Sequence, residues 1–85
     1  MKLAPIRLSS SAPVAKVHSD LGRWYRECRH SAGTSQPTAG RRGIAQPNVA
    51  RTERSGIRTI TTLIRLAAGL DCDVQIRLVP HRRKS

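Results

Sequence analysis

The chain has 85 residues and a formal net charge of +11 at pH 7, so it is at most one small and strongly basic domain. It has no Phe, one Trp and one Tyr, which leaves the core to Ile, Leu, Val and Ala and favours helices packed on helices over a β-sandwich or barrel. The charge indicates a polyanionic partner, because basic side chains release counterions when they bind phosphates.

Residues 1–18 have the composition of a flexible basic arm. The segment MKLAPIRLSSSAPVAKVH has two prolines, three consecutive serines and no acidic residue. Such an arm is either a solvated tail or a source of non-specific phosphate contacts. An organelle transit peptide has a similar composition, but the rest of the chain is typical of bacterial or phage proteins, so we expect a cytoplasmic bacterial protein.

A first helix is predicted from Ser19, a candidate N-cap, to a stop at Gly33. Apolar residues recur there at three- and four-residue intervals, namely Leu21, Trp24 or Tyr25, Cys28 and Ala32. The two aromatic residues are either a stacking platform for bases or core residues, and we favour the core. Cys28 and Cys72 can in principle pair, but no signal peptide is evident, so we expect reduced thiols.

The next segment, GTSQPTAGRRG, predicts only a weak second helix. Ser35 can cap it and Pro37 can open it, but Gly40 follows within a turn and no large apolar residue is present. The stretch from Gly43 to Gly56, GIAQPNVARTERSG, is stronger. It has a turn glycine, a proline fitted to a first helical turn, a Ser-Gly stop and several side chains able to reach base edges or phosphates, namely Gln46, Asn48, Arg51 and Arg54. We interpret it as a DNA-recognition helix.

A further helix is capped by Thr59 and has an apolar stripe of Ile60, Leu63, Ile64 and Ala67, widened by Leu66 and Leu70. Gly69 in its last turn costs about 1 kcal/mol relative to Ala. Residues 72–80 then alternate like a half-buried strand that Pro80 ends. Because no other segment alternates in this way, the expected partner is the same strand of a second copy, which predicts a homodimer.

These elements predict an all-α helix-turn-helix bundle of about four to five helices, the second of them weak, with a C-terminal β-strand. The divisions are a flexible basic arm over 1–18, a DNA-binding domain over 19–71, a strand for dimerisation or partner contact over 72–80, and a basic tail over 81–85.

From Ser19 to Pro80 the order of parts resembles the Cro/repressor-type (Xre-like) helix-turn-helix family, and most of all its antitoxins from toxin–antitoxin pairs. The matching positions are Ser35-Gln36, Gly43-Ile44-Ala45-Gln46, Val49, Thr52-Glu53, Thr59-Ile60 and Leu66-Ala67-Ala68-Gly69-Leu70. The resemblance implies base contacts from Gln46, Pro47, Asn48 and Arg51. It implies phosphate contacts from Ser35, Gln36, Arg54, Arg58, Thr59 and Ile60. It also implies a buried Glu53 paired with Arg29, the alternative being two unrelated surface charges.

Departures from the family pattern concern the second and third helices. The spacing from Gln36 to Gln46 is one residue short, Ala39 and Gly40 stand where Leu and Ala are usual, Ala45 replaces a Ser or Thr cap, and Thr52 replaces an apolar residue. We therefore expect the second helix to be short, poorly packed or frayed, and the domain to be marginally stable. A degenerate gene, or a fold completed by a toxin or by dimerisation, is consistent with this pattern.

The expected function is a sequence-specific DNA-binding transcriptional regulator, an antitoxin that represses its own operon and binds a toxin protein. The alternatives are a non-specific basic nucleic-acid-binding protein and a degenerate repressor fragment. An acidic membrane surface would satisfy the charge, but no apolar run spans a bilayer. No catalysis and no cofactor are expected, because the five acidic residues are not paired and there is no Gly-rich phosphate loop. Cys28, His30, Cys72 and His81 lack a specific metal-ligand spacing.

Overall fold

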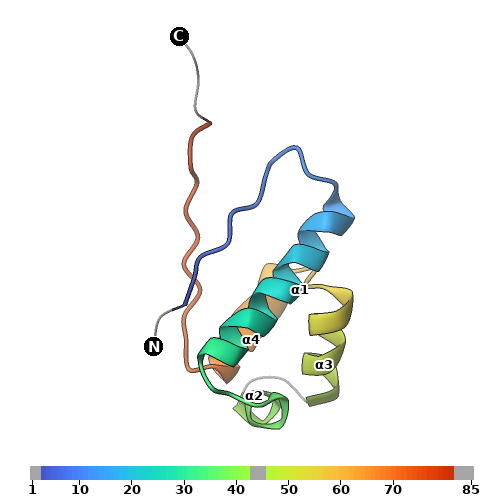
Figure 1. The fold of residues 1–85 in the computed structure, drawn as a ribbon, viewed down its shortest axis with the longest axis vertical. Coiled ribbons are helices and arrows are strands. Elements are labelled where there is room, and N and C mark those ends of the chain that lie inside the picture. The colour runs from blue at the N-terminus through green and yellow to red at the C-terminus, as the bar shows by residue number, and fades with distance from the viewer. Residues whose placement is uncertain (1–2, 43–45, 82–85) are drawn as a thin grey trace.

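A computed structural model describes residues 3–42 and 46–81, without the side chains of Gln46 and Pro47. The described part of the chain is a helical bundle of α1 (Val14–Ser31), α2 (Gln36–Arg42), α3 (Gln46–Ser55) and α4 (Ile60–Gly69). α3 packs against α1 and α2, and α2, which also packs against α4, closes one end of the bundle (Figure 1). The predicted all-helical bundle is therefore confirmed.

The first helix begins at Val14, five residues before the predicted N-cap Ser19, so the end of the flexible arm was placed too late. Pro13 is the N-cap, with φ −58° and no side-chain cap bond, and its carbonyl accepts from the Val17 N–H at 3.1 Å. The fixed φ of proline suits a helix start, which replaces the missing side-chain cap. Asp20 adds exposed ion pairs to Lys16 (2.8 Å) and Arg23 (2.6 Å) across the first turns.

The predicted stop of the first helix at Gly33 is confirmed. Gly33 has φ +66°, its N–H donates to the His30 carbonyl at 3.0 Å, and the Thr34 N–H donates to the Arg29 carbonyl at 3.1 Å. This pair of bonds is a Schellman motif, which needs a left-handed residue and therefore favours glycine. The motif turns the chain directly into α2.

The second helix has seven residues, as short as expected. Ser35 caps it, because its Oγ accepts from the Thr38 N–H at 3.3 Å. The expectation of poor packing is wrong at Ala39, which is 1% exposed. A Cβ placed on Gly69 of α4 would lie 2.5 Å from the Ala39 carbonyl oxygen, so the two helices meet backbone to backbone and small residues are required at both positions.

A second close approach joins α1 to the end of α3. A Cβ on Gly22 would lie 2.6 Å from the Thr52 carbonyl oxygen. Gly56 ends α3 with φ +105°, and the following Ile57 N–H donates to the His18 carbonyl at 2.9 Å. The predicted Ser55-Gly56 stop is therefore confirmed, whereas the turn predicted at Gly43 lies outside the described residues.

The last helix has its predicted cap, because Thr59 Oγ1 accepts from the Thr62 N–H at 3.1 Å. The buried hydrophobic residues of the bundle are Tyr25, Cys28, Ala39, Val49, Ile57, Leu63, Leu66, Ala67 and Leu70. Tyr25 is thus a core residue, as we favoured. The predicted stripe of α4 is wrong at Ile60 and Ile64, which are 50% and 53% exposed, because the helix turns Leu63, Leu66, Ala67 and Leu70 inward instead.

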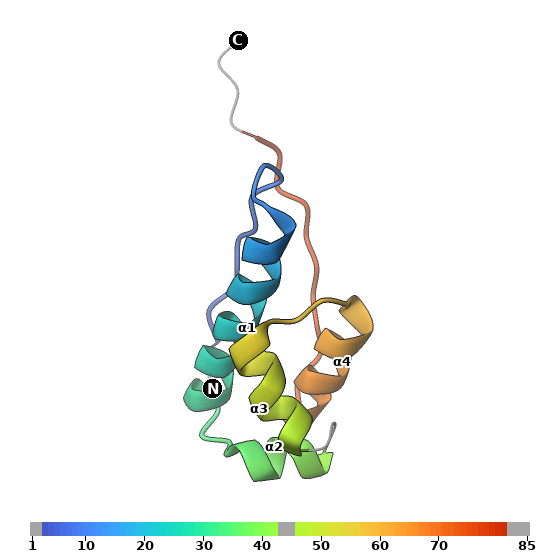
Figure 2. The ribbon, with the colours of Figure 1, turned by 90° about the vertical axis from the view of Figure 1, so that its right-hand side faces the viewer.

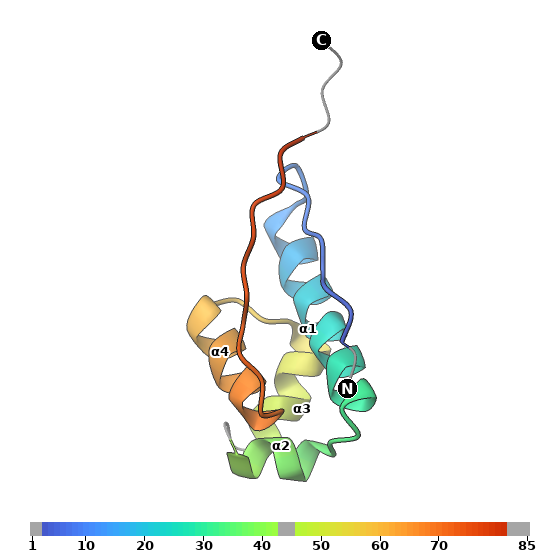
Figure 3. The same ribbon diagram turned by 90° about the vertical axis from the view of Figure 1, so that its left-hand side faces the viewer.

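The C-terminal strand predicted over 72–80 is not formed in the described part of the chain. The segment is extended and runs beside residues 3–10, on the side of α1 and α4 away from α3 (Figures 1 and 3). Cys72 and Val74 pack against the core, whereas Ile76 is 66% and Leu78 93% exposed. The alternation therefore reflects docking on the bundle over its first half, and the neighbour of the segment is the chain's own N-terminal segment.

Candidate nucleic-acid interface

The third helix turns a polar face outward and an apolar face inward. Val49 is fully buried, while Asn48, Arg51 and Arg54 are exposed. Thr52, which replaces an apolar residue, is half-buried and donates its hydroxyl to the Val49 carbonyl at 2.9 Å. The polar substitution therefore leaves no unsatisfied hydroxyl in the core.

Two of the predicted base-contacting residues, Gln46 and Pro47, lie in the first turn of α3 by their backbone. Their side chains lie outside what the structure describes, as do Gly43, Ile44 and Ala45. α2 lies across this N-terminal end of α3, as Figure 2 shows. The two helices therefore pack against each other at the N-terminal end of α3.

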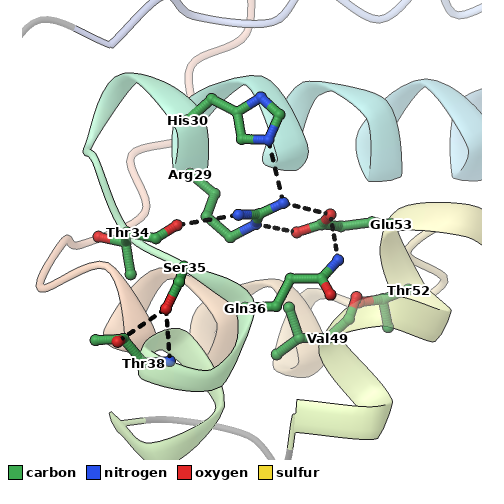
Figure 4. Close-up of polar contacts among 9 residues, drawn as sticks. All are labelled: Arg29, His30, Thr34, Ser35, Gln36, Thr38, Val49, Thr52 and Glu53. Atoms are coloured by element: carbon green, nitrogen blue, oxygen red, sulfur yellow. Dashed lines mark hydrogen bonds and ion pairs between the residues drawn. The ribbon is translucent and has the colours of Figure 1, made fainter.

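The predicted pair of Arg29 and Glu53 is present and buried (Figure 4). Arg29 Nε donates to Glu53 Oε2 at 2.5 Å, and Nη2 donates to Oε1 at 3.0 Å. The two side chains are 9% and 5% exposed. The alternative of two unrelated surface charges is therefore wrong. The hydrogen bond to Glu53 is the main reason why the pKa of Arg29 is raised above its ordinary value.

The Glu53 carboxylate also holds α2. Its Oε1 accepts a second hydrogen bond, from Gln36 Nε2 at 3.1 Å, and Arg29 Nη1 donates to the Thr34 carbonyl at 3.0 Å. One buried carboxylate on α3 is thus bonded to the end of α1 and to the first residue of α2 (Figure 4). This network holds α2 at a fixed angle to α3. No sequence motif of the chain predicts that angle.

The predicted phosphate-contacting residues fall into two groups, one at the start of α2 and one from the last turn of α3 to the start of α4. Ser35 and Gln36 begin α2. Ser35 is exposed and donates its hydroxyl to Thr38 Oγ1 at 3.0 Å, and the half-buried Gln36 side chain uses one amide N–H on Glu53. A primary amide has two N–H donors on one nitrogen, so Gln36 has a second N–H that can donate to a phosphate.

The other group lies at the C-terminal end of α3 and the start of α4. It consists of four exposed residues, namely Arg54, Arg58, Thr59 and Ile60. Thr59 Oγ1 is occupied as the α4 cap and donates to Thr62 Oγ1 at 2.9 Å, so its backbone N–H is the group better placed for a phosphate. Arg54 shares α3 with Arg51, whereas Arg58 and Thr59 follow that helix and Ile60 begins α4.

The helices α2 to α4 carry a strongly unbalanced charge. Between Gln36 and Gly69 the chain has six arginines and one acidic residue, Glu53, whose carboxylate is already paired. Sequence analysis assigned no role to three of these arginines. Arg41 and Arg42 are exposed in the last turn of α2, and Arg65 is exposed on α4. Arg41 Nη2 donates to Thr38 Oγ1 at 3.2 Å. The three-residue spacing from Thr38 to Arg41 was the signal that could have identified this contact.

The other candidate sites have little support in the described residues. Cys28 and Cys72 are free thiols. Within 3–42 and 46–81, no group of three or more His, Cys, Asp or Glu side chains could hold a metal ion. No described helix is both long and apolar enough to cross a bilayer.

No protein-family model matches the chain, and neither a curated protein nor a solved structure is detectably similar to it.

Proposed function

We propose that the protein is a sequence-specific double-stranded DNA-binding regulator of Cro/repressor type, with α3 in the major groove. The observation that carries this proposal is the Glu53 carboxylate, which bonds both Arg29 and Gln36. It locks α2 against α3 while Arg51 and Arg54 stay exposed on a surface without a free carboxylate. A basic helix held in this way can enter the groove without an acidic side chain repelling the phosphates.

In this proposal Arg51 reads a base edge, together with Gln46, Pro47 and Asn48. The positions Ser35, Gln36, Arg54, Arg58, Thr59 and Ile60 bind phosphates on either side of the groove. Two copies of α3 in successive major grooves would recognise a palindromic operator. The protein would repress its own operon as an antitoxin and bind a toxin through its C-terminal region.

A selection experiment tests the DNA-binding proposal. Random duplexes are selected with the wild-type protein, and the enriched duplex is then titrated against a scrambled one. We expect Arg51→Ala to lose about 1–3 kcal/mol of discrimination, the range of one bidentate base contact. Arg54→Ala should weaken binding to both duplexes and lower the slope of log affinity against log salt concentration by about one. Arg26→Ala is the matched control, since it removes one exposed charge from α1.

The result that would refute the assignment is Arg51→Ala binding the enriched duplex with undiminished preference. Failure of the selection to enrich any sequence would favour the second candidate, a non-specific nucleic-acid-binding protein. The six arginines over α2 to α4 support that candidate, because a charge field alone binds any duplex. Equal affinity for selected and random duplex at each salt concentration would establish it.

Co-expression tests the antitoxin role separately. The chain is expressed with the adjacent open reading frame of its own operon. We expect the frame alone to arrest growth, and the pair to grow and to co-purify. If neither rescue nor co-purification occurs, the antitoxin role is lost and a plain repressor remains.

A further inference from the structure

Two extended segments form a groove on the side of the bundle away from α3. They are residues 5–10 and residues 75–81, which run past α1 in the same direction (Figures 1 and 3). Two cavities of about 520 and 550 Å³ have lining residues from both segments. The cavities share four of these residues, namely Ile6, Arg7, Arg77 and Val79. They therefore adjoin and form one continuous groove, with one segment as each wall.

Hydrogen bonds hold the two segments near their ends but not along their middle. Trp24 Nε1 donates to the Ala4 carbonyl at 2.7 Å, and Ser10 Oγ and His81 Nε2 share a hydrogen bond of 3.3 Å. Between these ties, residues 5–8 and 75–79 make no backbone hydrogen bond within the described part of the chain. Extended backbone with unpaired N–H and C=O groups is a template for an added strand.

The groove carries an uncompensated positive charge. Arg7 lies on one wall and Arg77 on the other, both are exposed, and none of the described residues that line the groove is acidic. Neither arginine forms an ion pair with a described acidic side chain, whereas the nearby Lys16 and Arg23 both pair with Asp20. Two free guanidinium groups favour a partner with carboxylates, which match their planar set of donors.

Apolar side chains adjoin both arginines in the groove. Ile6 and Leu8 flank Arg7 in the sequence, while Leu78 and Val79 follow the other arginine, and all four apolar residues line the groove. A nucleic acid would leave these side chains uncovered, and its bases would find a single aromatic residue among the described lining residues. An extended peptide with alternating acidic and apolar side chains satisfies the charge, the apolar lining and the unpaired backbone together.

We propose that this groove binds an acidic, extended segment of a partner protein. Its carboxylates pair with Arg7 and Arg77, and its backbone pairs with that of the groove walls. The inference goes beyond the proposed function, because it adds the N-terminal segment to the contact and depends neither on DNA binding nor on the partner's being a toxin. A second copy of the chain is less suited to the groove, since residues 1–18 and 74–85 contain no acidic residue.

Two labelled peptides of equal length test the inference on the wild-type protein. One alternates glutamate with valine, and the other has lysine in place of each glutamate. Both have about six residues, the length that matches residues 5–10 at about 3.3 Å per residue. Fluorescence anisotropy measures the affinity, and Trp24, the only tryptophan, lines the groove and gives a second signal. We expect the glutamate peptide to bind at least about tenfold more tightly, because two ion pairs are replaced by two repulsions.

Methylation of alternate backbone nitrogens of the glutamate peptide tests the strand pairing. The methyl groups leave the side-chain charges intact but remove backbone donors. Each lost hydrogen bond should weaken binding by about two- to tenfold.

Charge reversal on the protein locates the site. Arg7→Glu combined with Arg77→Glu should lose the glutamate peptide and prefer the lysine peptide. Arg26→Glu combined with Arg65→Glu is the matched control, because it makes the same change in net charge at two exposed positions outside the groove. All four positions are exposed, so circular dichroism should show unchanged helix content. Arg51→Ala should bind the glutamate peptide like wild type, which separates this result from any failure of the DNA-binding proposal.

The inference is overturned if the glutamate peptide does not bind wild type up to about 1 mM, or binds no more tightly than the lysine peptide. Unchanged affinity of the methylated peptide also overturns it, as does an equal loss of binding in the groove variant and the control variant. Displacement of the glutamate peptide is the final criterion. If single-stranded DNA or a peptide of the chain's own residues 72–80 displaces it at a lower concentration than the unlabelled glutamate peptide does, the occupant is a nucleic acid or a second copy.

Discussion

Removing the Glu53 carboxylate should destabilise the whole domain and not only α3. Arg29 is only 7% exposed, so Glu53→Ala leaves a buried charge without its partner, and breaking a buried pair in this way typically costs about 3–5 kcal/mol. Gln36 loses its acceptor as well. The chain of 85 residues has a total stability of roughly 4–13 kcal/mol at the usual 0.05–0.15 kcal/mol per residue. The variant is therefore expected to lie at or near the limit of folding.

Urea unfolding followed by circular dichroism measures this effect. Glu27→Ala is the control, since Glu27 is an exposed acid on α1 and should change the free energy of unfolding by less than about 0.5 kcal/mol. The double variant Arg29→Met with Glu53→Leu should recover much of the loss, because apolar residues of similar volume can replace a buried ion pair. The reasoning is refuted if Glu53→Ala unfolds with the same midpoint as Glu27→Ala, or if the double variant is less stable than Glu53→Ala.

Three further predictions concern the core. Burial raises the pKa of Tyr25 to about 12 from an ordinary 10.0, so folding favours the neutral phenol. The contribution of this group to stability is therefore fully present below about pH 10 and is lost as the pH rises towards 12. Because Tyr25 is the only tyrosine, ultraviolet titration of native and urea-unfolded protein should give two separate phenol transitions, and coincident transitions would contradict this prediction. Gly69→Ala should destabilise the protein by about 1–3 kcal/mol through overpacking against Ala39, although helix propensity alone predicts a gain in stability. Urea unfolding measures the effect, with Thr61→Ala at an exposed position of α4 as the control, and an increased urea midpoint for Gly69→Ala would contradict the close approach. Cys72 should be alkylated faster than Cys28 in native protein, since burial raises the pKa of the Cys28 thiol. Mass spectrometry of peptides after short exposure to iodoacetamide measures which cysteine is alkylated first, and equal rates for the two cysteines in urea are the control.

The sequence predicted the helices where local signals agreed with the packing. Gly33 and Gly56 adopt a positive φ that favours glycine, and the Thr59 side chain makes the cap bond of α4. Each of these helix boundaries therefore depends on a single residue that the sequence shows directly. The pair of Arg29 and Glu53 was predictable only through the family resemblance, because 24 residues separate its partners. The bond from Gln36 to the same carboxylate was not predictable, since it depends on the angle between two helices.

The start of α1 was placed wrongly because the serine at position 19 is a stronger local signal than Pro13. A proline at the N-cap has no side-chain bond to offer, and its contribution is a fixed φ that sequence analysis also finds in turns and linkers. Tertiary contact decides between these uses here, since the His18 carbonyl accepts from Ile57 across the bundle. Small residues that fit close backbone approaches, Gly22 and Gly69, were likewise visible in the sequence only as weak helix formers.

The C-terminal segment shows how one pattern can have two physical origins. Alternation over Cys72 and Val74 is explained by docking on the bundle, whereas Ile76 and Leu78 continue the pattern while 66% and 93% exposed. A strand from a second copy that paired with this segment would cover such exposed, alternating apolar residues. A homodimer through this segment would therefore pair residues 76–79 and leave Cys72 and Val74 packed against the core. Ile76→Lys combined with Leu78→Lys should abolish such a dimer in sedimentation while sparing the helix content, and an unchanged dimer mass would place the contact elsewhere.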